Sequence, residues 1–130
     1  MNEPACESGD HPRRSFRPPN GEDLEKAASL FRALGDVSRL RILTTLAQSE
    51  ACVTELAEHS SESLSTVSQR LRVLRGEKLV IRRRQGKHIN YALADQHVAD
   101  LVQNALAHAG EGRARRRGAE SISIKETEIP

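Results

Sequence analysis

The chain has 130 residues, enough for one domain with a modest core, and its two Phe, one Tyr and no Trp leave that core to Leu, Val, Ile and Ala. It has no apolar run that could span a bilayer or serve as a signal peptide, so we expect a cytoplasmic protein without a membrane partner. Two cysteines are too few for a disulfide framework, and a formal net charge of +2 is too small to predict nucleic-acid binding by itself.

The first part of the chain, residues 1–21, is predicted to be a flexible arm because four prolines stand among polar and charged residues. The folded domain is expected to span residues 22–111. Its first helix begins near Glu22, where apolar residues recur at helical spacing, and ends at Gly35. A second helix follows Asp36, which is its candidate N-cap.

A helix-turn-helix is predicted in the middle of the chain. A short third helix over residues 53–59 is followed by turn and cap formers at residues 60–63, where a fourth helix starts. In such a motif the N-terminal residues of the second helix face the DNA bases. The residues expected at or near the DNA are therefore Ser65, Thr66, Ser68, Gln69 and Arg70. Within this set, Gln69 is suited to adenine and Arg70 to guanine or phosphate.

A basic β-hairpin is predicted directly after that helix. Apolar and polar residues alternate over residues 79–93, and Gln85, Gly86 and Lys87 mark the hairpin loop. We expect Arg84 and Lys87 to lie over DNA phosphates or the minor groove. A solvated basic hairpin is the ordinary alternative, but a basic loop directly after a candidate recognition helix favours double-stranded DNA. Two such modules in one dimer predict an inverted-repeat operator.

The segment of residues 95–111 has the apolar rhythm of an amphipathic helix, and Asp95 is placed to cap its start. His97 and His108 lie about three turns apart on nearly the same face, roughly 16 Å along the axis. One helix therefore cannot close these two imidazoles around one metal ion. Beyond it, residues 112–130 lose the periodicity and are predicted to form a flexible, charged tail.

A metal site shared by two copies of this helix would satisfy the spacing. If two copies pack antiparallel across a two-fold axis, Asp95 and His97 of one chain meet His108 and Glu111 of the other, twice per dimer. Two imidazoles and two carboxylates suit zinc, with Co(II) as a surrogate, and offer no thiolate for Cu(I). Each residue alone has an ordinary role as a cap or an exposed polar side chain, but the four together favour a metal site.

Catalysis is not expected of such a site. Four protein ligands close the coordination shell, whereas catalytic zinc keeps a position open for water. The sequence also has no H-E-x-x-H motif, no Gly-rich phosphate loop and no evident Ser/His/Asp arrangement. We therefore expect neither an enzyme nor a small-molecule substrate.

These motifs together resemble the ArsR/SmtB family of metal-sensing winged-helix repressors, over about residues 24–111. The segments that carry the resemblance are FRALGDVSRLRIL, ACVTEL, STVSQRLRVLR and RRQGKHINYAL, with DQHVADLVQNALAHAGE marking a zinc-sensing subgroup. The resemblance implies a mainly α fold with a small β-hairpin, a dimeric winged helix-turn-helix whose first and last helices form the homodimer interface. It implies a zinc site between the paired terminal helices, with D-x-H on Asp95 and His97 and H-x-x-E on His108 and Glu111.

The resemblance also implies the direction of regulation. Metal bound across the interface fixes the orientation of the two subunits and hence the distance between their recognition helices. If that distance mismatches the operator, metal and DNA oppose each other, with a reciprocal coupling on the order of 1 to 3 kcal/mol. The residues alone do not give the sign of this coupling. In the family, metal relieves repression, usually of genes for metal efflux or sequestration.

A second metal site found in some relatives corresponds here to Cys52 and Glu55 of the third helix, joined by Cys6 and His11 from the arm. Relatives that depend on this site often have a second cysteine where this chain has Thr54. A small, buried Cys52 with an unused Cys6 is an equally good interpretation.

The turn of the helix-turn-helix departs from the family pattern. Many relatives have an apolar residue, Gly and another apolar residue where this chain has Ser60, Ser61 and Glu62. Without glycine, a left-handed backbone position in this turn would be strained.

Two other interpretations stay open at the level of the sequence. One is a winged-helix regulator that senses thiol oxidation through Cys6 and Cys52 and has a vestigial histidine site. The other is a protein-binding helical module with no DNA role.

Overall fold

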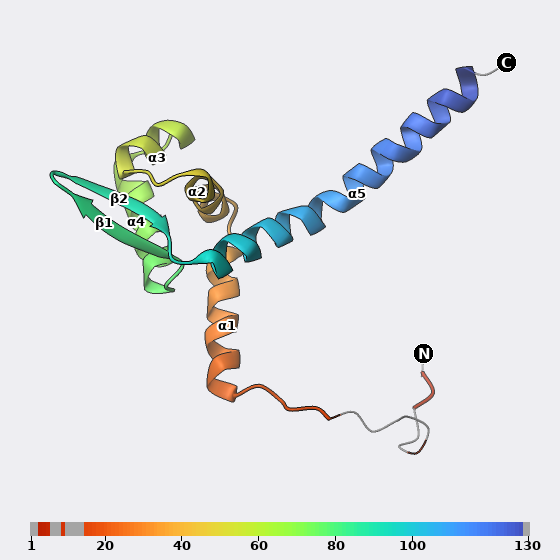
Figure 1. The fold of residues 1–130 in the computed structure, drawn as a ribbon, viewed down its shortest axis with the longest axis horizontal. Coiled ribbons are helices and arrows are strands. Elements are labelled where there is room, and N and C mark those ends of the chain that lie inside the picture. Colours follow the sequence, from red (N-terminus) through yellow and green to blue (C-terminus); the bar gives the residue numbers. More distant parts are fainter. Residues whose placement is uncertain (1–2, 6–8, 10–14, 129–130) are drawn as a thin grey trace.

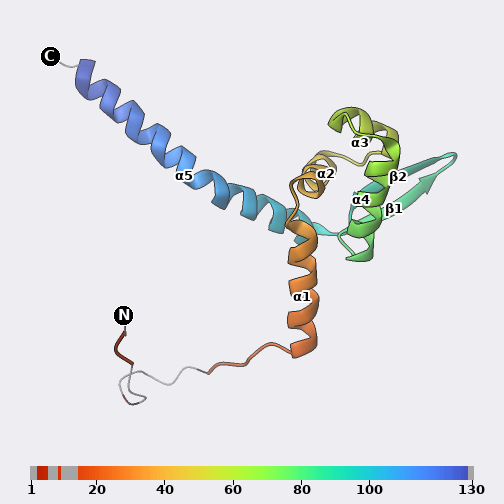
Figure 2. The same cartoon turned by 180° about the vertical axis from the view of Figure 1, so that it is seen from behind.

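The computed structural model describes residues 3–5, 9 and 15–128, with side chains described as far as residue 113. Three helices and a hairpin form a packed body, and a further helix leaves this body at each end in a different direction (Figures 1 and 2). The elements in chain order are α1 (Gly21–Leu34), α2 (Val37–Gln48), α3 (Val53–Ser60), α4 (Leu64–Gly76), β1 (Val80–Gln85), β2 (His88–Leu93) and α5 (Gln96–Glu128).

Side-chain caps fix where several helices begin. A side-chain oxygen accepts a backbone N–H at the start of three helices, from Asn20 for α1, Ser63 for α4 and Asp95 for α5. Asp36 occupies the predicted N-cap position of α2, but its side chain makes no capping hydrogen bond. Its Oδ2 lies instead 3.5 Å from Arg39 Nη1. The sequence therefore predicted the start of α2 correctly, but not the ion pair that Asp36 forms there.

The core is aliphatic, as the composition predicted. Its most deeply buried side chains come from the body and from the first two turns of α5: Leu43, Val67, Leu71, Leu74, Leu79, Val80 and Val102. Helix α5 joins this core through Val98 and Val102, which are 6% and 1% exposed. The rest of α5 runs clear of the body (Figure 1).

The hairpin is antiparallel, with Val80 opposite Leu93 and Gln85 opposite His88. Its base is tied to the body because Ala51, between α2 and α3, exchanges backbone hydrogen bonds of 3.1 and 2.8 Å with Tyr91. The wing is therefore fixed relative to the helix-turn-helix at its base and projects at its tip.

The turn between α3 and α4 contains a residue in the left-handed backbone conformation, which the sequence predicted would be strained without glycine. Ser61 has φ 59° and ψ 31°, and the N–H groups of Ser61 and Glu62 both donate to the carbonyl of Ala57. These bonds close the end of α3, while a residue with a Cβ occupies a conformation that costs on the order of 1 to 2 kcal/mol relative to right-handed backbone.

Helix α5 continues to Glu128, whereas the sequence predicted that helical structure ends near Glu111. The residues beyond Glu111 include many Ala, Glu, Arg and Lys residues, which favour helix without forming an apolar face. Apolar periodicity could not detect such a helix. Of the helices described, none is long and apolar enough to cross a membrane.

Candidate DNA-binding and metal-binding surfaces

Helix α4 presents a polar face to solvent. Val67, Leu71 and Leu74 bury one side of the helix in the core, which leaves Ser65, Ser68 and Gln69 exposed on the other. These three are the predicted DNA-facing residues whose side chains are exposed to solvent and free to contact DNA. A fourth, Thr66, is half-buried and belongs to the helix cap, because its Oγ1 accepts a hydrogen bond of 2.8 Å from the Ser63 hydroxyl.

Arg70, also predicted to face DNA, is held by an acidic partner. Its Nη1 forms an ion pair with Glu62 Oε2, and the side chains of the two residues are 25% and 29% exposed. The pair spans the turn between α3 and α4, so in the free protein the guanidinium braces the helix-turn-helix. Glu62 is eight residues away, and sequence spacing gave no signal for this contact.

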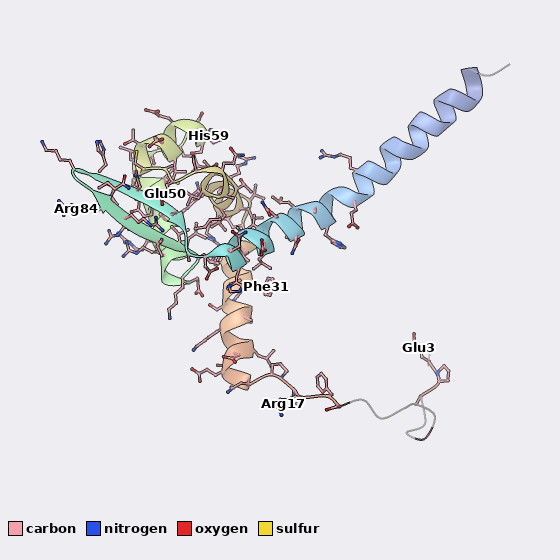
Figure 3. All side chains as sticks on the ribbon, in the orientation of Figure 1. Glu3, Arg17, Phe31, Glu50, His59 and Arg84 are labelled. Atoms are coloured by element: carbon pink, nitrogen blue, oxygen red, sulfur yellow. The ribbon has the colours of Figure 1, made fainter. Side chains whose placement is uncertain are left out.

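The wing carries a row of exposed cations. Arg82, Arg84 and Lys87 are all exposed, with Arg84 on the outer half of the hairpin (Figure 3). Arg84 Nε donates to the Gly86 carbonyl at 3.3 Å, which orders the side chain near the loop. Arg83 differs from its neighbours because its Nη1 lies 2.9 Å from Glu50 Oε1, so part of its charge is neutralised within the chain.

The four residues predicted to bind metal form two separate pairs on α5 and its cap. His97 Nδ1 lies 3.7 Å from Asp95 Oδ1, and His108 Nδ1 lies 3.8 Å from Glu111 Oε2. Both imidazoles are open to solvent, with exposed fractions of 95% for His97 and 87% for His108. Asp95 Oδ1 also accepts from Val98 N at 3.0 Å, which leaves Oδ2 of the same carboxylate for another ligand.

Within the part of the chain whose side chains are described, no group of three or more His, Cys, Asp or Glu side chains could hold a metal ion. Each of the two pairs on α5 therefore provides two donors, and the helix keeps the pairs about three turns apart. A single chain brings together Asp95 with His97, and His108 with Glu111, but not one pair with the other.

The second predicted metal site is only partly within the described residues. Cys52 is the N-cap of α3 and half-buried, and Glu55 Oε1 accepts from Cys52 N at 3.3 Å. The pKa of Glu55 lies below its ordinary value, chiefly because the Cys52 side chain donates a hydrogen bond to the carboxylate, and the Cys52 backbone N–H adds to this. Cys6 and His11 lie outside the described residues.

Comparison with known proteins places this architecture in a family. The model of the "Bacterial regulatory protein, arsR family" matches residues 36–82, from α2 into the hairpin. A protein of Synechocystis sp. named transcriptional repressor SmtB homolog is 42% identical over 90 residues, which cover 69% of this chain and 68% of that protein. The chain belongs to the ArsR family. A protein of Staphylococcus aureus named cadmium resistance transcriptional regulatory protein CadC homolog is 36% identical over 85 residues, which cover 65% of this chain and 70% of that protein.

A solved structure supports the fold of this ArsR-family chain. The solution structure of Mb0332 from Mycobacterium bovis, described as a homodimeric winged helix-turn-helix DNA-binding domain, matches with a TM-score of 0.69 and 31% identity. The match covers 76% of this chain and 92% of that one. The predicted mainly α winged helix-turn-helix with a hairpin wing is thus confirmed, and the protein is a DNA-binding transcriptional regulator rather than an enzyme. Its metal ligands, DNA-contacting residues and own dimer stay predictions.

Proposed function

We propose that this protein is a metal-responsive transcriptional repressor. Its metal-free homodimer binds an inverted-repeat operator, and zinc bound between the two α5 helices lowers the affinity for DNA. Release of the operator then allows expression of genes for metal efflux or sequestration. The observation that carries the proposal is the presence of two exposed, incomplete ligand pairs at the two ends of the same stretch of α5.

The proposal assigns four donors to each metal ion. A tetrahedral zinc site needs four ligands, and each pair provides two. Antiparallel packing of two α5 helices brings Asp95 and His97 of one subunit to the partner's His108 and Glu111, and symmetry repeats the site. An imidazole and carboxylate set also accepts Co(II). The relative named for cadmium resistance supports a response to a divalent metal in general.

The outer faces of α1 and α5 are suited to a second copy of the chain. Leu24 and Phe31 on α1 are 55% and 59% exposed, and Leu106 on α5 is 48% exposed. Figure 3 labels Phe31 on α1. Neither face is covered by the body of the same chain, and large apolar side chains clustered at a surface favour association. The homodimeric state of the M. bovis domain supports a dimer of this chain as well.

A short physical path joins the proposed site to the DNA-binding elements. Only Ala94 and Asp95 separate β2 from α5, and Ala94 N donates to Leu79 O at 2.9 Å just before β1. Metal held at Asp95 and His97 therefore fixes the start of α5 relative to the wing and to the end of α4. Across the dimer, the same bonds fix the separation of the two recognition helices, and a coupling on the order of 1 to 3 kcal/mol would be reciprocal between metal and operator.

Two histidine variants test the proposal. We expect His97→Ala and His108→Ala to keep the dimer and metal-free DNA binding but to lose zinc-induced release, measured by fluorescence anisotropy of labelled operator DNA. His59→Ala, which removes an exposed imidazole from α3, is the matched control and should respond to zinc normally. If the α5 variants still release DNA on zinc addition, the ligand assignment is wrong.

A cysteine variant separates this proposal from thiol sensing. Replacing Cys6 and Cys52 together by serine leaves the imidazole and carboxylate ligands in place, so the zinc response should be retained. Loss of the response in this variant, with the histidines intact, would favour a thiolate site or an oxidation sensor.

A further inference from the structure

A groove of about 630 Å³ lies between α1, the turn after α4 and the start of α5. Its charged lining is mostly acidic, with four carboxylates and two ammonium groups: Glu22, Glu25, Glu77, Asp95, Lys26 and Lys78. Its apolar lining includes Leu30, Val98 and Leu101. An acidic rim is complementary in charge to a basic helical segment.

The contacts inside the groove leave its acidic character in place. Lys26 Nζ lies 3.2 Å from Glu22 Oε1, so one of the two lysines already offsets one carboxylate. Glu77 Oε1 accepts a hydrogen bond of 2.8 Å from the Ser29 hydroxyl, which holds this carboxylate between α4 and α1. Glu25 is exposed and makes no ion pair among the side chains that the structure describes.

The proposed metal site identifies what enters the groove. Asp95 and His97 both line it, so the partner's His108 and Glu111 can reach them only if the partner's α5 runs along the groove. The same antiparallel register continues beyond these ligands. It carries the partner's Arg113 about 4.5 Å past the start of this subunit's α5, toward the turn that carries Glu77, because Gln96 then faces residue 110 and a helix rises about 1.5 Å per residue.

The sequence of α5 beyond the ligands is complementary in charge. Arg113 is exposed and is the first of four arginines in the next turns of the helix, with Arg115, Arg116 and Arg117 following in the sequence. These residues lie on the part of α5 that leaves the body away from the wing in both views (Figures 1 and 2). The opposed directions argue against a contact with the DNA bound by the same subunit.

We propose that the arginine-bearing continuation of α5, beginning at Arg113, docks in the acidic groove of the partner subunit. This inference rests on the antiparallel α5 pairing of the proposed function. The continuation of α5 past Glu111 then serves as a second, electrostatic clamp on the dimer, in addition to the apolar contacts of α1 and α5. It acts in the absence of metal and extends the interface from the ligands to the turn that follows the recognition helix.

Charge reversal on each side of the contact tests the clamp. We expect Arg113→Glu and Glu25→Lys each to raise the dimer dissociation constant of the full-length, metal-free protein about three- to tenfold in sedimentation equilibrium. Exposed ion pairs are individually weak, but reversal replaces attraction by repulsion and two-fold symmetry repeats the effect in each dimer. The combined variant should recover most of the loss, and raising the salt concentration should reduce the differences.

Controls and a second variant keep the test decisive. Arg72→Glu on α4 and Glu58→Lys on α3 make the same charge changes at exposed positions outside the groove and should leave dimerisation unchanged. Replacement of all four arginines by glutamine should weaken the dimer at least as much as Arg113→Glu. Circular dichroism establishes that each variant is folded.

The outcomes separate the clamp from the metal site. If the arginine variants dimerise normally, or lose only affinity for DNA, the clamp is wrong and the arginines serve another role. In that case a protein that still binds two zinc ions per dimer retains the proposed function. If the unaltered protein is monomeric with zinc bound, the α5 pairing itself fails and the clamp fails with it.

Discussion

In the proposed metal site, Asp95 combines two tasks in one carboxylate. Oδ1 caps α5 by accepting the Val98 N–H, and the opposite oxygen is available for metal. A capping residue at a helix start contributes about 1 kcal/mol to stability, so a simple truncation would disturb the fold and the proposed site together. Asparagine retains the capping oxygen but loses the negative charge that favours zinc.

Two substitutions at Asp95 therefore give different results. Asp95→Asn should keep the free energy of unfolding within a few tenths of a kcal/mol, whereas Asp95→Ala should lower it by about 1 kcal/mol. Both should weaken zinc-induced release of operator DNA. Urea unfolding of the metal-free protein measures the first effect and DNA anisotropy the second. Equal stability of the two variants would show that the cap contributes little.

Several residue-scale features could be predicted because they depend on near neighbours in the chain. The capping role of Asp95 is one, and the left-handed strain expected in the α3–α4 turn is found at Ser61. The ion pairs of Arg70 with Glu62 and Arg83 with Glu50 could not be predicted. Each joins different elements, so the pairing depends on how those elements pack rather than on spacing along one helix.

At the scale of elements, the α3–α4 turn and the wing both set how the protein meets DNA. The turn positions α4 through a left-handed Ser61, and neighbouring Ser60 lies in α3 with its hydroxyl donating to the Leu56 carbonyl at 2.9 Å. Of these two adjacent serines, Ser60 is helical and Ser61 is in the left-handed conformation. The sequence predicted the bounds of α1 to α4 and of the hairpin well, because caps, turn residues and apolar periodicity agree there, but α5 beyond Glu111 lacked all three signals.

Glycine substitutions at these two serines should have opposite signs. Ser61→Gly should stabilise the protein by up to about 1 kcal/mol, since relief of the left-handed strain exceeds the added freedom of the unfolded chain. Ser60→Gly should destabilise it by roughly 0.5 to 1 kcal/mol, because glycine is unfavourable within a helix. Thermal and urea unfolding measure both. Destabilisation by both substitutions would contradict the strain assigned to Ser61.

The two central arginines of the wing should differ in their contribution to DNA binding. Arg84→Gln should lower affinity and reduce the slope of log K against log salt by about 0.9 for each phosphate that is no longer neutralised, or roughly 1.8 per dimer. Arg83→Gln should have a smaller effect, because Glu50 already shares that charge. Salt titrations of operator binding measure both slopes. Equal slopes for the two variants would mean that Arg83 leaves Glu50 when DNA binds.

At the scale of the whole molecule, α1 and α5 diverge from the body and both carry exposed apolar residues, and α5 with its cap carries the two His–carboxylate pairs of the proposed metal site. The spacing of His97 and His108 predicted a shared site because a helix is rigid enough for sequence distance to become spatial distance. The groove beside that site could not be predicted in this way, because its lining comes from three separate segments of the chain.

Metal binding should saturate at two ions per dimer. The Co(II) form should show the ligand-field absorption of a tetrahedral nitrogen and oxygen site, without intense thiolate-to-metal charge transfer. Removal of the metal by a chelator should restore operator affinity, since the coupling is reciprocal. A single ion per dimer, or a strong thiolate band that is lost in a Cys52→Ser variant, would contradict ligation by the two α5 helices alone.

The two-residue connection between β2 and α5 allows little independent movement of these two elements. A rotation of α5 at Asp95 must move the end of β2 at Leu93 as well, because the backbone hydrogen bond from Ala94 to Leu79 ties this connection to the body. In the proposed sensor, metal bound between the two subunits should therefore rotate the hairpin as well as change the distance between the recognition helices. The grip of the wing tips on the DNA backbone should loosen together with the recognition helices, in one concerted step.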